Sequence, residues 1–302
     1  MNDLSNKLST VPQLSKVRTF LFGALAFMWF GEMVQWGFLA STGGWQNIWN
    51  EVAPQLTTAL LITHAIRAAA KGALGVMAVF GMRSKNPATR TALFVSMSLV
   101  PPLNILFPCR ADGFPLGTTA VAAIFSLILW TSFFLFKEPA QQSRDFVQSP
   151  SSRETIKYIW FAVNSTVLTL VSLFFLSAPR TALDFIFPSL SGLLRTYEAG
   201  LSSMTSSNLS SGTHLLALAI ASWAAVVIGR SNPSLRQAMA AASIVHAGLI
   251  CLLPLRRVIL EVDGNSAASS ILFAFVPLLV GWVLYATFLY RVEIKKRKEA
   301  YL

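Results

Sequence analysis

Apolar stretches of about 20 residues recur along the whole sequence, and they restrict the fold more than any other feature. A transmembrane helix needs about 20 mainly apolar residues, because the hydrocarbon core is about 30 Å thick and a helix rises 1.5 Å per residue. Eight stretches have this length: Thr19–Ala40, Thr58–Gly81, Pro87–Phe107, Thr118–Phe136, Ile156–Ser177, Gly212–Gly229, Pro233–Leu253 and Ser269–Tyr290. Since backbone groups in lipid must be satisfied within their own segment, the sequence predicts an all-α integral membrane protein with eight transmembrane helices.

The composition supports the membrane class. Charged residues make up 12% of the 302 residues and hydrophobic residues 54%, whereas about 25% of the residues in an ordinary soluble domain are charged. A soluble globular fold is therefore not expected.

The distribution of basic residues predicts the orientation. The chain carries 24 Lys and Arg and a net charge of +11. Seventeen of these residues lie in the two tails and in alternate loops, five lie on the opposite side, and Arg67 and Lys71 lie inside the second stretch. The positive-inside rule then puts both termini on the cytoplasmic side of a bacterial inner membrane or of an organellar membrane. This placement explains the charge without a nucleic-acid partner.

A shift of the chain by 146 residues superposes several landmarks. The matching pairs are Asn86 with Asn232, Pro87 with Pro233, Arg90 with Arg236, and Pro108 with Pro254. Two unrelated helices could also begin with Asn-Pro, because Asn is a favoured N-cap and Pro a favoured first residue. The additional matches favour two tandem four-helix repeats, 1–146 and 147–302, related by an axis along the membrane normal.

Charged residues inside two of the stretches form the main candidate site. Glu32 lies in the first stretch, with Gln35 one turn outward, and His64, Arg67 and Lys71 share one face of the second. Glu32 and Arg67 both lie about 12 to 13 Å below the predicted outer end, by the helical rise. We therefore expect the Glu32 carboxylate to pair with Arg67 or Lys71, because an unpaired charge in hydrocarbon is costly.

A predicted helix break lies at a similar depth in the third stretch. Pro101 and Pro102 cannot donate helical hydrogen bonds, and Asn104 follows them. Irregular polar backbone at membrane depth is tolerated where it is buried in protein or lines water.

The charge cluster has two interpretations. The ion pair could be a structural staple between two helices, or the cluster could form a ligand or proton site. The second repeat lacks equivalent charges, since Val171 aligns with Glu32, and Thr213 and Ala217 lie near Arg67 and Lys71. A symmetric carrier is expected to keep polar residues in both halves, so this difference favours the staple.

Weaker signals are interpreted as structural. His64 and His246 could ligate a b-type haem axially, although isolated histidines are more often core residues, and no cofactor is predicted. No metal-ligand spacing, phosphate-binding loop or nucleophile motif is present. Trp36 is assigned to an aromatic belt at the membrane surface. The segment Ser202–Ser211 is predicted to be a mobile outer loop containing the glycosylation sequon at Asn208.

Three functions remain open. The leading hypothesis is a non-catalytic accessory or scaffold subunit bound to other membrane proteins, because the small-residue runs Ala68–Ala70 and Ala240–Ala242 suit helix packing. The alternative is a transporter of protons or small molecules that uses Glu32, Arg67 and Lys71. The second alternative is a membrane enzyme acting on a lipid or isoprenoid, with Glu32 or His64 as acid–base.

Overall fold

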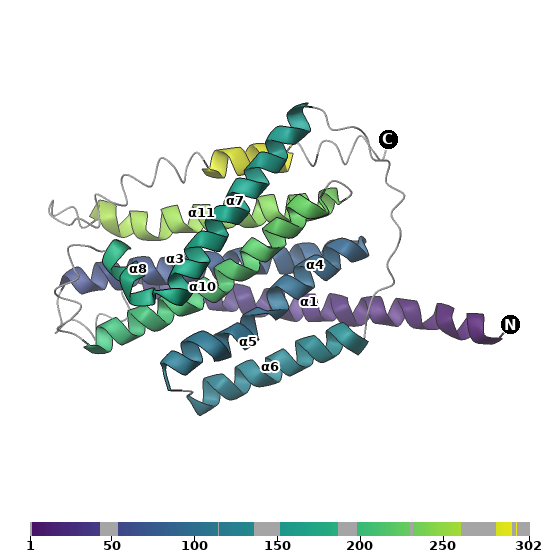
Figure 1. Cartoon of the computed structure of the whole chain (residues 1–302), viewed down its shortest axis with the longest axis horizontal. Helices are drawn as coiled ribbons and strands as arrows, with labels where there is room; N and C mark the ends of the chain where they lie inside the picture. Colours follow the sequence, from purple (N-terminus) through teal and green to yellow (C-terminus); the bar gives the residue numbers. More distant parts are fainter. Residues whose placement is uncertain are drawn as a thin grey trace.

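The computed structural model describes residues 2–42, 54–113, 115–135, 152–186, 198–229, 232–260, 282–291 and 294, and within these ranges it contains helices and no strands. The elements are α1 (Asn2–Thr42), α3 (Pro54–Arg83), α4 (Pro87–Ser98), α5 (Val100–Asn104), the π-helix η1 (Ile105–Cys109), α6 (Leu116–Leu135), α7 (Ser152–Ser177), α8 (Pro179–Ile186), α10 (Glu198–Val227), α11 (Pro233–Leu260) and the helix 282–291. Figure 1 shows α1, α3 and α11 lying lengthwise, with α6 along one edge and α7 and α10 crossing the bundle.

The membrane class is confirmed. In the described part of the chain, six segments are long and apolar enough to cross a membrane: Lys16–Phe38, Ile62–Arg83, Pro87–Cys109, Leu116–Leu135, Tyr158–Ser177 and Met204–Val227. They correspond to the first six predicted stretches. The seventh stretch lies within α11, and most of the eighth, Ser269–Tyr290, falls outside the described residues. The count of eight therefore stays a prediction.

The predicted loop Ser202–Ser211 is wrong, because this segment is helical. α10 begins at Glu198, about four turns before the predicted start at Gly212, and both Ser210 and Ser211 are buried. Hydroxyl groups inside a helix can donate back to its own carbonyls, as Ser211 does to the Ser207 carbonyl at 2.9 Å. A serine-rich segment can therefore be buried without unsatisfied donors.

The predicted glycosylation site lies on the buried face of α10. Asn208 is 1% exposed, and its amide donates to the Pro179 carbonyl at 3.3 Å. The sequon is therefore inaccessible to modification in the folded chain.

The third span is broken near the predicted position. α4 ends at Ser98, α5 carries Pro101 and Pro102 in its first turn, and the chain continues as η1 with Pro108 inside it. Proline cannot donate to the carbonyl four residues earlier, so a wider π-turn accommodates Pro108. The break directs Asn104 toward α10, where it accepts a hydrogen bond from Thr213 at 2.7 Å.

The first residues of α4 and α11 meet at one end of the bundle. Asn86 caps α4 by accepting from the Ala88 and Thr89 amides at 2.9 and 3.2 Å. Its side-chain nitrogen also donates to the Asn232 side-chain oxygen. Both helices therefore begin at the same end, as the repeat hypothesis requires.

Arginines collect at this same end. Arg90 on α4 donates to Thr19 of α1 at 3.4 Å, and Arg236 on α11 donates to Tyr158 of α7 at 2.8 Å. Arg18 donates to Thr91 of α4 at 3.3 Å. We call this the basic end, and the positive-inside rule predicts that it faces the cytoplasm.

The small-residue runs pack inside the chain. Ala68, Ala69 and Ala70 on α3 are fully buried, as are Ala240 and Ala242 on α11. α3 lies against α1, α10 and α11, and small side chains allow this close approach. These five alanines therefore contribute to helix packing within the chain.

The contact between α1 and α3 generates a stability prediction. A Cβ at Gly81 would overlap the ring of the fully buried Phe22, whereas a Cβ at Gly31 meets no atom within 4 Å. Overpacking costs about 1–3 kcal/mol, and an exposed helical Gly→Ala change gains about 1 kcal/mol. Gly81→Ala should lower the midpoint of thermal unfolding, and Gly31→Ala should leave it unchanged or raise it. An unchanged midpoint for Gly81→Ala would contradict this packing.

Candidate functional site

A cavity of about 500 Å³ lies among α1, α3, α5, η1, α6 and α10. Four acidic or basic side chains line it, namely Glu32, Arg67, Lys71 and Asp112. The remaining lining residues include apolar side chains from α1 and α6, among them Met28, Val121 and Phe125. The volume lies within the range of small-molecule sites, which usually combine an apolar wall with a few polar groups.

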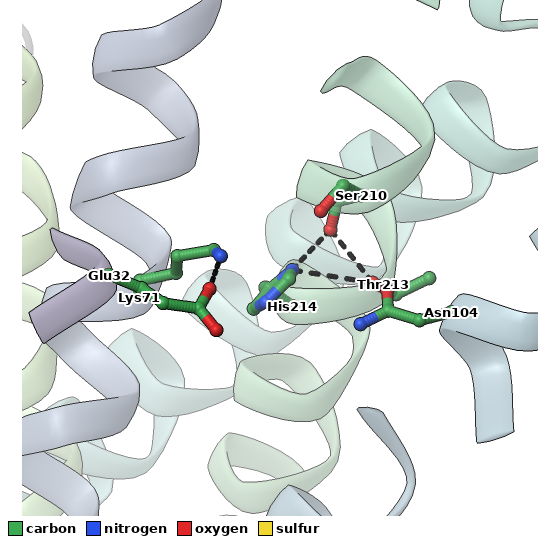
Figure 2. A network of polar contacts seen from close by, with 6 residues as sticks. All are labelled: Glu32, Lys71, Asn104, Ser210, Thr213 and His214. Carbon is green, nitrogen blue, oxygen red and sulfur yellow. Dashed lines mark hydrogen bonds and ion pairs between the residues drawn. The ribbon is translucent and has the colours of Figure 1, made fainter. Parts of the chain in front are cut away.

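Glu32 and Lys71 form an ion pair at the inner part of the cavity. The Lys71 side chain is 3% exposed and that of Glu32 is 35% exposed; Figure 2 shows the two side chains pointing toward each other. The sequence predicted a pair with Arg67 or Lys71, and the depth estimate made Arg67 level with Glu32. Lysine, one turn deeper, reaches Glu32 because its long flexible stem can extend along the helix.

Arg67 contacts an aromatic ring. Its guanidinium carbon lies 3.9 Å from the centroid of Trp36, within the range of a cation–π interaction. Its Nε is buried without a hydrogen-bond partner, and in the described part of the chain no carboxylate lies within ion-pair distance of it. Trp36 therefore supports the site through Arg67, a contact that the sequence analysis missed; its place in an aromatic belt stays a prediction.

Two predicted site residues, His64 and Gln35, do not line the cavity. His64 contacts the Trp36 ring, at 4.7 Å between centroids, and the Ser207 hydroxyl at 3.4 Å. Gln35 is exposed on α1. His64 thus supports the position of Trp36, whereas Gln35 is separate from the cluster.

The two histidines considered as haem ligands are far apart. Gly72 of α3 packs against Leu249 of α11, and the two helices are antiparallel because α3 ends, and α11 begins, at the basic end. His64 and His246 lie on opposite sides of this contact, about 16 Å apart along the bundle axis by the helical rise. One metal ion could not bind both at the roughly 2 Å length of a metal–imidazole bond.

A polar network beside the ion pair joins α5 and α10. Thr213 donates to the Asn104 side chain at 2.7 Å, and His214 Nδ1 contacts the Ser210 carbonyl. Figure 2 shows this network beside Glu32 and Lys71, and the ring of Trp29 packs edge-on against His214 at 5.2 Å. The site therefore combines residues from both halves of the chain.

The mouth of the cavity lies at the turn between η1 and α6. Asp112 lines the cavity and accepts a hydrogen bond from Ser206 at 2.7 Å. Gly113 follows with φ 73°, a conformation that favours glycine and ends the helical segment. Asp112 and Ser206 were both missed by the sequence analysis, since one was assigned to a loop and the other to a mobile segment.

The opposite end of the cavity is closed by packed side chains. Beyond Lys71, toward the basic end, Leu25, Leu74, Met77 and Met97 are buried in one apolar core. The cavity therefore opens at the end of the bundle away from the basic end.

Comparisons with protein-family models, with curated proteins and with solved structures found no match to this chain.

The ion pair can be tested with a double-mutant cycle. Glu32→Gln and Lys71→Gln should each lower stability by about 2 kcal/mol, because each leaves a charge without its partner. The double variant should lose less than the sum, with a coupling energy of about 1–3 kcal/mol. Thermal unfolding in lipid nanodiscs measures all four proteins.

Arg110→Gln provides the control, because Arg110 is exposed and does not line the cavity. Its effect should add to that of Glu32→Gln. Additive effects for Glu32 and Lys71 would mean that this ion pair does not contribute to stability.

Proposed function

We propose that this chain is a membrane carrier that binds a small ionised molecule in the cavity between α1, α3, α6 and α10. The observation that carries the proposal is a cavity of about 500 Å³ that is lined by Glu32, Arg67 and Lys71 from the first two spans and whose far end is closed by the apolar core. An ionisable residue inside a span is a candidate functional group because burying it is costly.

A structural staple alone accounts for only part of this arrangement. Two helices can be fixed by the Glu32–Lys71 pair without any open volume beside it. Arg67 and Asp112 add two further charges to the same lining, and neither is needed by the pair. A staple needs neither these two additional charges nor an open cavity, so their presence favours a ligand site.

The predicted orientation makes the cavity outward-facing. If the basic end lies in the cytoplasm, the mouth at Asp112 faces the opposite compartment and the apolar core separates the site from the cytoplasm. A carrier exposes its site to one side at a time, and a closed inner end fits the outward-open state.

A tandem four-helix repeat would supply the moving parts of such a carrier. The contact between Asn86 and Asn232 supports a two-fold relation, as do the matching contacts of Arg90 with α1 and of Arg236 with α7. Under this proposal eight spans form two bundles that rock about the shared site, in a bacterial inner or organellar membrane.

The other two hypotheses have less support. Five of the six alanines in the runs that suited a scaffold subunit are buried within the chain, so these side chains offer little surface to a partner protein. For an enzyme, Glu32 is held by Lys71 and His64 lies outside the lining, so the two candidate acid–base groups do not face a common substrate.

Water access to the cavity can be tested at two adjacent alanines of α6. Ala122 lines the cavity, and Ala123 is exposed on the helix surface away from it. In a chain with Cys109→Ala and Cys251→Ala, the Ala122→Cys thiol should react with a membrane-impermeant methanethiosulfonate. The Ala123→Cys thiol should react at least tenfold more slowly, because a thiol facing lipid does not ionise.

Equal protection of both thiols in native membranes would contradict a water-filled site.

Native purification in mild detergent followed by mass spectrometry provides the second test. A carrier should retain a small molecule that is lost from the Glu32→Gln, Lys71→Gln double variant. Stoichiometric protein subunits retained equally by both forms, without a small molecule, would support the scaffold instead.

A further inference from the structure

We propose that the ligand of this cavity is an amphipathic organic anion whose acidic group binds Arg67 and whose apolar part lies against Met28, Val121 and Phe125. The inference rests on the proposed function, because it requires the cavity to be a ligand site. It adds the chemical class of the ligand and the residue that recognises it.

Arg67 has the geometry of an anion receptor. The guanidinium carbon of Arg67 lies 3.9 Å from the centroid of the Trp36 ring. This contact holds the group through the aromatic ring and leaves its N–H donors for a carboxylate or phosphate, to which arginine can donate two parallel hydrogen bonds. The buried Nε has no hydrogen-bond partner among the described residues, so one of these donors is unused.

The two carboxylates that line the cavity, Glu32 and Asp112, have other partners. Glu32 pairs with Lys71. Asp112 lies on an exposed turn at the mouth, where it accepts a hydrogen bond from Ser206 at 2.7 Å. Water screens an exposed carboxylate, so Asp112 compensates the Arg67 charge only weakly. An anion bound at Arg67 would supply the compensation that a charge at membrane depth requires.

The apolar part of the cavity lining determines the rest of the ligand. Met28 of α1 and Phe125 of α6 line the cavity, together with Val121, which is 65% exposed. A fully ionic ligand would leave this apolar surface in contact with water, whereas an alkyl or aromatic group would cover it. Since the wall continues onto the surface of α6, the acidic group can belong to a free organic acid or to a lipid headgroup.

The first test uses octanoate as the probe, with octyltrimethylammonium as its cationic counterpart. Binding is measured by titration calorimetry on the full chain in phosphatidylcholine nanodiscs, with empty discs subtracted. Octanoate should bind wild type and Arg110→Gln equally and bind Arg67→Gln at least tenfold more weakly. Octyltrimethylammonium should show no dependence on Arg67. Equal octanoate affinity for wild type and a folded Arg67→Gln variant would overturn the proposal.

A second measurement leaves Arg67 unchanged, in case its replacement prevents folding. The Ala122→Cys thiol is modified by anionic sulfonatoethyl and cationic trimethylammonioethyl methanethiosulfonates, each rate divided by that for a free thiol. The anionic reagent should react at least fivefold faster, and octanoate should slow it. A preference for the cationic reagent, or none, would overturn the anion assignment while the cavity itself stood. Failure of both reagents would instead contradict the proposed function.

The source of the anion is separated by adding phosphatidylglycerol to the nanodiscs. If the natural ligand is a lipid, this lipid should compete with octanoate and be retained by wild type but not by Arg67→Gln in native mass spectra. If it is a free acid, octanoate binding should be independent of phosphatidylglycerol. Either result supports recognition of an anion by Arg67.

Discussion

The structure depends on the need to compensate charge where water is scarce. The ion pair between Glu32 and Lys71 joins α1 to α3. These two helices also pack extensively against each other. The aromatic side chains around them serve the same purpose, since Lys71 lies 6.0 Å from the Trp29 ring and 5.8 Å from the Trp36 ring. A charged residue at this depth thus organises the ring positions and helix contacts around it.

The features that follow from hydrophobicity and local backbone chemistry could be predicted from the sequence. The spans follow from apolar length, the start of α4 follows from the capping preference of Asn86, and the break in the third span follows from Pro101 and Pro102. Each of these depends on one segment and its solvent. The position of Glu32 near the basic residues of α3 followed as well, because a short connection between two spans favours an antiparallel pair.

The features that depend on contacts between distant segments could not be predicted. The choice of Lys71 over Arg67 depends on side-chain reach across α1 and α3, and the role of Trp36 depends on which face of α1 meets Arg67. The serine-rich start of α10 was predicted to be a loop because the prediction used the polarity of the serines and not their spacing. Ser206, Ser210 and Thr213 recur at intervals of four and three residues, which is typical of one helix face.

The contact between the first residues of α4 and α11 is asymmetric, although each helix begins after an asparagine. A hydrogen bond between two asparagines has a direction: Asn86 donates through its nitrogen, and Asn232 accepts through its oxygen. The Asn86 oxygen caps its own helix, whereas the Asn232 nitrogen donates to the Ile228 carbonyl at 3.1 Å. If Asn232 were the donor and Asn86 the acceptor, the two side chains would have to exchange these hydrogen-bonding roles. The direction of this one hydrogen bond thus gives two asparagines in similar positions different roles.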